Sequence, residues 1–391
     1  LIDPCPLWDH DGTAYLVHAW ARSRSGISNR LTAHRMSPDG RRVLGGAATI
    51  VDGDAIAGCH TLEGPKWYRR DGWYWILAPA GGVATGWQSA LRSRTVWGPY
   101  EHRIVLAQGA SAVNGPHQGG WVTTGTGQDW FLHFQDRGPH GRVVHLQPMR
   151  WRADGWPVMG IDDGSGCGTP VTTHPVPVAT GTTPVPPGPV VADELTTAVP
   201  GPLWTWQANP GADWAAPAGD GLRLACRFSP AVDLRELPQV LGRRLPGGPL
   251  VVTARIALRC DLPGARTGLA VLGDSYAWAG LERTPDAVAL VHRVAAPDAA
   301  EVDAVRPLPL ADGQAWVSLR IEITDAAECL FSATLDDGRA LPPGPTFPAT
   351  PGRWVGATLG VFAATSTADG LVPDGPVGHA MVASLRWDGS C

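Results

Sequence analysis

Short runs of alternating apolar and polar residues, separated by glycine turns, recur along the first 160 residues. Two such runs joined by a short polar turn predict a β-hairpin. Long stretches with the 3.6-residue period of a helix do not occur. The hairpin signals are WDHDGTAYLVHAW (8–20), HRMSPDGRRVL (34–44), WYRRDGWYWILAP (67–79), TTGTGQDWFLHFQD (123–136) and MRWRADGWPVMG (149–160).

The strongest of these turns are almost evenly spaced. Gly12, Gly72 and Gly127 lie 60 and 55 residues apart. A repeat of that length with about four strands predicts the blades of a β-propeller. Residues 1–160 then hold slightly under three blades, fewer than the roughly four to eight of a closed ring. Because the chain begins LIDPCP without a methionine, we expect further blades upstream of Leu1.

The amino-acid composition of the sequence changes near residue 162. Residues 162–202 are rich in Pro, Thr and Gly without apolar periodicity, which predicts a semi-extended linker. Residues 203–391 return to alternating strands with turns about every ten residues, the pattern of a two-sheet sandwich. The sequence therefore predicts an all-β protein with a partial propeller at 1–161, a linker at 162–202 and a β-sandwich accessory domain at 203–391.

Composition supports this interpretation and excludes several others. The 49 glycines and 37 prolines suit many short strands, and the 18 tryptophans outnumber tyrosine and phenylalanine together. Tryptophan faces stack on sugar rings, but most of these residues are expected in the core. A net charge of −5 with 17% charged residues gives no basic surface for nucleic acid. No apolar run reaches the length of a transmembrane helix.

The seven cysteines are scattered and form no CxxC pair, so their spacing does not favour a structural zinc site. Their odd number leaves at least one without an intramolecular partner. This pattern leaves the cellular compartment open.

Two carboxylates occupy comparable places in the repeat. Asp3 lies in LIDPCPLWDHDG and Glu63 in TLEGPKWYRRDG, each followed by a proline, an aromatic residue and an Asp-Gly turn. Equivalent strands of neighbouring blades point toward one axis, so the two side chains are expected to converge. Glycoside hydrolysis needs such a pair, since one acid protonates the leaving oxygen while a second carboxylate works on water or on the sugar. Taken alone, Asp3 also fits a turn and Glu63 the wet side of a strand.

The residues around these carboxylates resemble glycoside hydrolase family 43. The resemblance rests on IDPCPLWDHDGTAYLV, LEGPKWYRRDGWYWILAPAGG, NGPHQGGWV and GRVVHLQPMRW. It implies a five-bladed propeller, of which this chain holds part, and hydrolysis of β-xylosides or α-L-arabinofuranosides with inversion. In the second half, LWTWQANP, AGLE and PGRWVGATLGVFA resemble the concanavalin-like β-sandwich of the family's β-xylosidases.

The resemblance assigns roles to four residues. It makes Glu63 the proton donor and Asp3 the carboxylate that modulates the pKa of that acid and orients the substrate. It places His117, in GPHQGG, beneath the sugar subsite and makes Arg142, in GRVVHLQ, a residue that grips sugar hydroxyls. Without the resemblance, His117 fits a core histidine equally well and Arg142 a solvated strand arginine.

Two tryptophans are further candidates for contact with a sugar. Trp87 lies in the loop that follows the acid, and Trp20 ends the first hairpin. Packing beneath the neighbouring loop is an equal alternative for each. The resemblance requires no cofactor, although some family members hold calcium or another ion on the propeller axis near the histidine matched by His117. One histidine does not establish a metal site.

The sequence departs from the family at the general base, which is an Asp near an N-terminal DP motif of the first blade. No residue here matches it. Asp9 and Asp11 fit hairpin turns, and nothing assigns the role to Asp136. We therefore expect the printed chain to carry the acid and its modulator without the base, and to have little activity on its own.

The leading interpretation is an inverting, exo-acting β-xylosidase that acts on xylo-oligosaccharides. An α-L-arabinofuranosidase acting on arabino-oligosaccharides is the alternative within the same class. A non-catalytic carbohydrate-binding protein and a structural propeller that binds proteins are alternatives from other classes. No nucleic-acid or membrane partner is expected, and the oligomeric state stays open.

Overall fold

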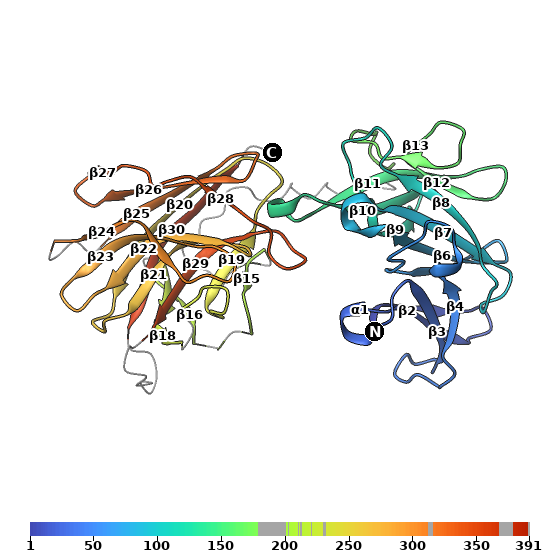
Figure 1. Ribbon diagram of the computed structural model, residues 1–391, viewed down its shortest axis with the longest axis horizontal. Coiled ribbons are helices and arrows are strands. Elements are labelled where there is room, and N and C mark those ends of the chain that lie inside the picture. The colour runs from blue at the N-terminus through green and yellow to red at the C-terminus, as the bar shows by residue number, and fades with distance from the viewer. Residues whose placement is uncertain are drawn as a thin grey trace. The chain divides into compact units, whose positions relative to one another are not determined.

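The computed structural model (Figure 1) consists almost entirely of β-strands, which confirms the all-β prediction. The chain divides into two units, Leu1–Asp136 with Arg142–Val185 and Arg137–Gly141 with Pro186–Cys391. The structure describes residues 1–178, 201, 203–209, 211, 213–219, 221–229, 232–311, 316–366 and 378–389.

The first unit contains three antiparallel meanders, each with four consecutive strands in spatial order. The first meander comprises β1 (Ile2–Trp8), β2 (Ala14–Ala19), β3 (Arg30–Met36) and β4 (Ala48–Asp52). The second comprises β5 (Lys66–Arg70), β6 (Trp73–Ala80), β7 (Trp87–Ser93) and β8 (Glu101–Ala107). The third comprises β9 (His117–Thr123), β10 (Asp129–Asp136), β11 (Arg142–Trp151) and β12 (Pro157–Met159).

The turn glycines seen in the sequence lie at equivalent points of these sheets. Gly12, Gly72 and Gly127 each lie in the turn between the first two strands of their meander, and all three have a positive φ near +70 to +80°. Glycine adopts this backbone conformation at lower cost than other residues, so the turns could be predicted from the positions of glycine in the sequence. The repeat therefore marks blade-like sheets.

Neighbouring sheets bury their apolar faces against one another, as the repeat predicts. One hydrophobic cluster joins the first and second meanders, where the rings of Tyr15 and Trp67 lie 6.1 Å apart. A second cluster joins the second and third meanders, where Trp75 and Trp156 meet edge to face at 5.4 Å.

The sequence placed the start of the linker at residue 162, but the structure still contains short strands beyond that point. Strands β13 (Ile161–Asp162) and β14 (Gly168–Thr169) pair with each other, and β14 adds to the second sheet by parallel pairing with β8. The sequence missed this because two-residue strands have no measurable periodicity. The part of the predicted linker at 179–200 lies outside the described residues.

The second unit is a sandwich of two large sheets, as expected. The first sheet has the order β15 (Thr205–Trp206), β19 (Val240–Arg244), β29 (Thr358–Thr365), β21 (Ala265–Leu272), β22 (Tyr276–Arg283), β23 (Val288–Ala295) and β24 (Val302–Pro309), with β18 (Arg227–Phe228) beside β29. The second has the order β16 (Ala215–Ala218), β17 (Gly221–Ala225), β30 (His379–Gly389), β20 (Leu250–Arg259), β25 (Val317–Ile323), β26 (Glu328–Leu335) and β27 (Ala340–Leu341), with β28 (Phe347–Pro348) beside β26.

The sandwich core lies between the two sheets and draws side chains from both. Strand β25 shows how the pattern produces it, because Val317, Leu319, Ile321 and Ile323 are buried while the residues between them are exposed. Successive side chains of a strand point to opposite faces, so one face joins the core and the other meets solvent.

Helices are few and short. The described residues form the α-helices α1 (Arg22–Ser25) and α2 (Gly82–Thr85) and the 3₁₀ turns η1 (Gly53–Ala55) and η2 (Gly138–His140). None of the helices in the described part of the chain has the length and apolar character required to cross a membrane.

Candidate active site

Three of the predicted site residues enter at the same point of successive sheets. Asp3 lies near the start of β1, Glu63 three residues before β5, and His117 at the start of β9. A proline lies within two residues of each. The equivalence seen in the sequence between Asp3 and Glu63 thus extends to a third sheet.

The chain around Glu63 is fixed by its neighbour Leu62. The Leu62 side chain is buried in the first hydrophobic cluster, and its N–H donates to Oδ1 of Asn29 at 2.9 Å. The Glu63 N–H donates to the Pro79 carbonyl at 3.1 Å. The segment is therefore held at Leu62 by burial and at Glu63 by its backbone. The Glu63 side chain is 31% exposed.

A buried imidazole holds one oxygen of this carboxyl group. Nε2 of His117 lies 2.8 Å from Oε1 of Glu63, and the histidine side chain is only 1% exposed. Phe134, which pairs with His117 across the sheet, packs against the imidazole at 5.7 Å between ring centroids. Among the described residues Nδ1 of His117 has no hydrogen-bond partner. The contact with Glu63 is therefore the polar anchor of the ring.

Asp3 is bound to the residues that follow the other two. Its Oδ2 accepts hydrogen bonds from the Gly64 N–H at 3.0 Å and from Nε2 of Gln118 at 3.1 Å. Together with the bond between Glu63 and His117, these contacts join the starts of three sheets. The structure therefore brings Asp3, Glu63 and His117 to one place. Their chemical roles stay predictions.

Arg142 lies at the same end of the third sheet. Strand β10 pairs with both flanking strands, which places Phe134 opposite His117 and Asp136 opposite Arg142. The Arg142 guanidinium stacks over the Phe134 ring at 4.6 Å. Among the described residues it forms no hydrogen bond or ion pair, and its side chain is exposed. Its N–H donors are therefore free to meet a ligand.

The two candidate tryptophans have mainly local contacts. Trp87 begins β7, leans over Gly81 and meets the His60 ring edge to face at 5.8 Å. Trp20 follows β2 and donates from Nε1 to Oγ1 of Thr32 at 2.9 Å. Both are half-buried, which agrees with the packing alternative and leaves part of each ring accessible. The ring contacts and hydrogen bonds described for both tryptophans are with residues other than Glu63, so their contact with sugar stays a prediction.

Sequence reasoning missed two polar side chains that hold the site together. Gln118 binds Asp3 and also approaches Gly64, where a Cβ atom would lie 2.4 Å from its Oε1. Asn29 is buried and binds Leu62 together with Cys59 and Asp54. Gln118 lies beside the predicted histidine in GPHQGG, so adjacency was the available signal. Asn29 gave none, because its partners are distant in the chain.

The remaining acidic candidates are accounted for by turns and strand ends. Asp9 accepts the Gly12 N–H through its carbonyl, and Oδ1 of Asp11 accepts the Thr13 N–H at 2.8 Å, as expected for hairpin-turn residues. Asp136 ends β10 opposite Arg142. The Asp9 carboxylate also accepts a hydrogen bond from the Tyr74 hydroxyl and lies 3.6 Å from Nε of Arg69.

The described residues do not form a metal site of their own. Among them, no group of three or more His, Cys, Asp or Glu side chains is arranged to hold an ion. Calcium prefers six to eight oxygen ligands, whereas His117 presents nitrogen and its neighbour Glu63 already accepts from it. The ion that the resemblance allows near His117 stays a prediction, and no step of the proposed chemistry rests on it.

The blade-like sheets, the grouped carboxyl residues and the sandwich form the architecture expected of a propeller-type glycoside hydrolase. Comparison with known families agrees: the profile of glycosyl hydrolases family 43 matches residues 1–157. That of the β-xylosidase C-terminal concanavalin A-like domain matches residues 192–372. The chain belongs to glycoside hydrolase family 43 and carries the family's C-terminal sandwich.

Curated relatives include xylosidases and arabinofuranosidases. A putative β-xylosidase of Xylanibacter ruminicola is 35% identical over 92% of this chain and 64% of its own length. A non-reducing end α-L-arabinofuranosidase of Bacteroides ovatus is 27% identical over 59% of this chain and 46% of its own length. The chain thus spans less than two thirds of the length of these relatives.

Solved structures share the fold at low sequence identity. The xylan β-1,4-xylosidase of Bacillus halodurans superposes with a TM-score of 0.80 at 20% identity, covering 99% of this chain and 76% of that protein. A bifunctional protein of Bacteroides eggerthii gives a TM-score of 0.81 at 21% identity, covering 100% of this chain and 48% of that protein. These similarities establish the propeller-and-sandwich fold.

Proposed function

We propose that this chain carries the proton-donating part of an inverting, exo-acting β-xylosidase that acts on xylo-oligosaccharides. The observation that carries the proposal is the contact between the partly exposed Glu63 and the buried His117, braced by Asp3. Three successive sheets supply these residues, so the arrangement depends on the propeller itself. A carboxyl group held at one oxygen and open to solvent at the other is suited to protonate a leaving group.

The neutral His117 tautomer with a proton on Nε2 fits both states of the acid. While Glu63 is protonated on Oε2, its Oε1 accepts from the imidazole. After the proton has moved to the glycosidic oxygen, the same N–H donates to a carboxylate, and a charge-assisted hydrogen bond is about twice as strong. The hydrogen bond therefore stabilises the Glu63 carboxylate formed by proton transfer more than it stabilises the protonated acid. This difference lowers the activation barrier of the proton transfer.

The other residues have positioning roles in this proposal. Asp3 holds the Gly64 backbone and Gln118, and thereby fixes the segment that bears Glu63. The guanidinium of Arg142, stacked on Phe134, presents N–H donors to sugar hydroxyls. Water attack needs a general base, and no motif in the printed chain supplies that residue.

An external nucleophile tests this assignment. Azide replaces the water that a base would activate, so with 4-nitrophenyl β-xyloside we expect azide to raise turnover and form the α-xylosyl azide. Glu63→Gln should keep that reaction, because 4-nitrophenolate leaves without protonation. With xylobiose, whose leaving group needs a proton, the substitution should lower azide-driven turnover by about 10²- to 10⁴-fold.

Glu322→Gln, an exposed change on β25, is the matched control and should leave both rates unchanged. Equal loss of both rates in Glu63→Gln would contradict the acid role. Sugar binding without any azide-driven turnover would support a carbohydrate-binding protein, and the absence of sugar binding would support a structural propeller.

The relatives favour xylosides over arabinofuranosides, since the more similar one, at 35% identity, is named a putative β-xylosidase. The arabinofuranosidase from Bacteroides ovatus keeps the second candidate open at 27% identity. The same azide assay with 4-nitrophenyl α-L-arabinofuranoside decides between them. Faster turnover of the arabinofuranoside would replace the xylosidase proposal while leaving the role of Glu63 intact.

A further inference from the structure

Two cysteines of the sandwich follow two strands of the same sheet, on either side of a third. Strand β30 lies between β17 and β20, and its first residue, His379, pairs with the last residue of each of them. The next residue after β17 is Cys226, and the next residue after β20 is Cys260. The two cysteines therefore flank Gly378, the residue that precedes β30.

Both thiols belong to the core of the sandwich. Cys226 continues the inward-facing series of Leu222 and Leu224 in the core cluster. Cys260 continues that of Leu258 on β20. Residues two apart on a strand point to the same face, so the two cysteines share one side of the sheet. Cys226 is 0% and Cys260 4% exposed, and both are present as thiols in the structure.

The glycine between the two cysteines leaves room for their thiols to meet. A Cβ atom at Gly378 would lie 2.6 Å from Cβ and 2.8 Å from Sγ of Cys260. The Cys260 side chain thus occupies the space that a side chain at position 378 would fill. On the other side, the Cys226 N–H donates to the Gly378 carbonyl at 2.9 Å. The two thiols are hydrogen-bonded to each other across this glycine.

This hydrogen bond gives the two sulfurs different reactivity. It lowers the pKa of the Cys260 thiol below its ordinary value, because the Cys226 thiol donates to the Cys260 thiolate. The same bond, together with burial, raises the pKa of Cys226. Since the thiolate is the reactive form of cysteine, Cys260 is the sulfur that meets an oxidant first. Cys226 is then next to it as the resolving thiol.

We propose that Cys226 and Cys260 form a redox-active pair that hydrogen peroxide closes into a disulfide beside the start of β30. The Cys260 thiolate attacks one peroxide oxygen and becomes a sulfenic acid, and hydroxide leaves. The Cys226 sulfur then displaces the sulfenic hydroxyl group, which forms the S–S bond and releases water. In total the two thiols lose two electrons and two protons, and the peroxide is reduced to two molecules of water.

The oxidant is small enough to reach this pair. Hydrogen peroxide is close to water in size, and fraying at the end of a ladder admits such a molecule to buried groups. The pair lies in the sandwich and takes nothing from Glu63, so the proposal is independent of any glycosidase activity.

Closing the disulfide draws the ends of β17 and β20 toward each other. Alternate strands of a regular sheet lie about 10 Å apart, whereas the Cα atoms of a disulfide lie about 4.4–6.8 Å apart. The ladder pairs end at His379, so the two cysteines are not held at the spacing of the sheet and can approach over Gly378. Such a bridge carries strain, and a strained disulfide is readily reduced. The pair therefore suits a reversible switch.

Peptide mapping without reductant tests the pair. The full chain is reduced, freed of reductant, treated with a small excess of hydrogen peroxide at low protein concentration, and then blocked with N-ethylmaleimide. The peptide that contains Cys226 should be recovered joined to the peptide that contains Cys260, lighter than their sum by the mass of two hydrogen atoms. Dithiothreitol should separate them again.

Cys226→Ser tests the order of the two steps. Serine keeps an O–H that can donate to the Cys260 thiolate but cannot form a disulfide, so the sulfenic acid should accumulate. Dimedone, which labels sulfenic acids, should therefore mark Cys260 about tenfold more in this variant than in the parent chain. The linked peptide should be absent.

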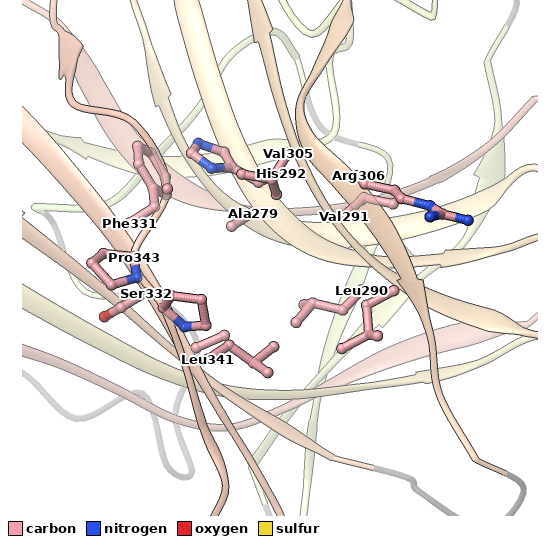
Figure 2. A pocket seen from close by; sticks show the side chains of 14 residues that line it. Ala279, Leu290, Val291, His292, Val305, Arg306, Phe331, Ser332, Leu341 and Pro343 are labelled. Carbon is pink, nitrogen blue, oxygen red and sulfur yellow. The ribbon is translucent and has the colours of Figure 1, made fainter.

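Cys329→Ser is the matched control, since Cys329 is another fully buried cysteine of the same core. Its strand, β26, also lines an apolar cavity of about 240 Å³, where the rings of Phe331 and His292 lie next to each other (Figure 2). Oxidation that only followed access to the core would favour Cys329 over the proposed pair. The control variant should keep the linked peptide.

Far-ultraviolet circular dichroism checks that both variants are folded. Recovery of Cys226 and Cys260 from the oxidised parent chain as separate blocked peptides would overturn the proposal. A link from Cys260 to a different cysteine, or dimedone labelling of Cys260 that is equal in Cys226→Ser and the parent chain, would do the same.

Discussion

At the scale of single residues, the site depends on one imidazole that is both buried and bound to a partly exposed acid. His117 contributes a hydrogen bond to the Glu63 carboxyl and a packing surface to Phe134. These two contributions can be separated by a substitution that keeps the ring volume. If His117 is purely structural, such a substitution should leave proton donation by Glu63 unchanged. If His117 positions the acid, the substitution should slow the reactions that need a proton.

We predict that His117→Phe keeps the fold and slows the azide-driven reaction of xylobiose by about tenfold to a hundredfold. The loss corresponds to one hydrogen bond to a charged group, about 1.5–3 kcal/mol. Turnover of 4-nitrophenyl β-xyloside should change much less, because its leaving group needs no proton. Equal slowing of both substrates would contradict the positioning role, and rapid quench measurements of both rates decide the matter.

Gly64 is the second residue on which the site depends. Its φ of +58° is costly for other residues, and a Cβ atom there would collide with the Gln118 side chain that binds Asp3. Gly64→Ala should therefore lower the free energy of unfolding by about 2–4 kcal/mol, from the backbone strain and the collision together. Gly127→Ala is the control, since its φ is +81° but no atom lies within 4 Å of the new methyl group.

The control should lose only the strain contribution, about 1–2 kcal/mol. Urea unfolding followed by tryptophan fluorescence measures both values. Equal losses in the two variants would show that the contact between Gly64 and Gln118 contributes nothing.

The carboxyl residues were predictable from sequence because each lies in a local motif that repeats. Asp3 and Glu63 are each followed by a proline, an aromatic residue and an Asp-Gly turn. Gln118 and Asn29 were not predictable, because their partners lie 115 and 33 residues away in the chain. A polar side chain with a distant partner has no signature until the sheets are placed together.

At the scale of elements, the tryptophans reveal how two blade-like sheets are joined. Arg92 on β7 lies between two indole rings, 4.6 Å from Trp73 and 4.3 Å from Trp156. The Arg94 guanidinium lies 3.6 Å from the centroid of the Trp73 ring, and that of Arg103 lies 4.7 Å from the centroid of Trp156. This Arg–Trp stack combines apolar area with cation–π attraction.

Composition indicated many tryptophans but did not separate packing from sugar binding. Whether a tryptophan packs inside the protein depends on which arginines lie next to its ring. The register of three neighbouring strands determines this arrangement. The hairpins themselves were predictable, since their turn glycines and strand periodicity are local. Strands β13 and β14 were not, because two residues are too few to show a period.

We predict that Arg92→Met lowers the free energy of unfolding of the first unit by about 1–3 kcal/mol. Methionine keeps much of the apolar stem but removes a charge that meets two rings and also pairs with the exposed Glu101 at 2.9 Å. A partly buried cation–π contact contributes about 1–2 kcal/mol, and an exposed ion pair about 0–1 kcal/mol. Arg94→Met should cost less than about 1 kcal/mol, because that arginine is exposed and meets one ring. Denaturant unfolding compares them, and equal losses would argue against the sandwiched geometry.

At the scale of the whole molecule, each unit contains a buried histidine that resists protonation. Burial lowers the pKa of His133 in the first unit to about 4, and it does the same for His292 in the second. Both are at most 5% exposed, and in the described part of the chain Nε2 of each lacks a partner. An ordinary histidine in the unfolded chain titrates near pH 6.5, so folding and protonation are coupled in both units.

The sign of this coupling predicts a loss of stability in acid that begins above the pH at which carboxylates are protonated. Between pH 6.5 and about pH 4 the unfolded chain binds a proton at each of these positions and the folded chain does not, so stability falls as the pH falls through this window. The full difference corresponds to about 3 kcal/mol for each histidine. Urea unfolding at pH 7 and pH 5 should therefore show that both units lose stability.

The two contributions can be removed one unit at a time. His133→Asn keeps a donor near the Phe134 carbonyl, which His133 now meets through Nδ1 at 3.2 Å. The substitution should reduce the pH dependence of the first unit alone, and the remainder belongs to groups such as His18 and His102, whose pKa values burial also lowers. His292→Phe should do the same for the second unit, because position 292 then carries no titrating group. If either variant loses as much stability as the parent chain between pH 7 and pH 5, the acid lability of that unit originates in other groups.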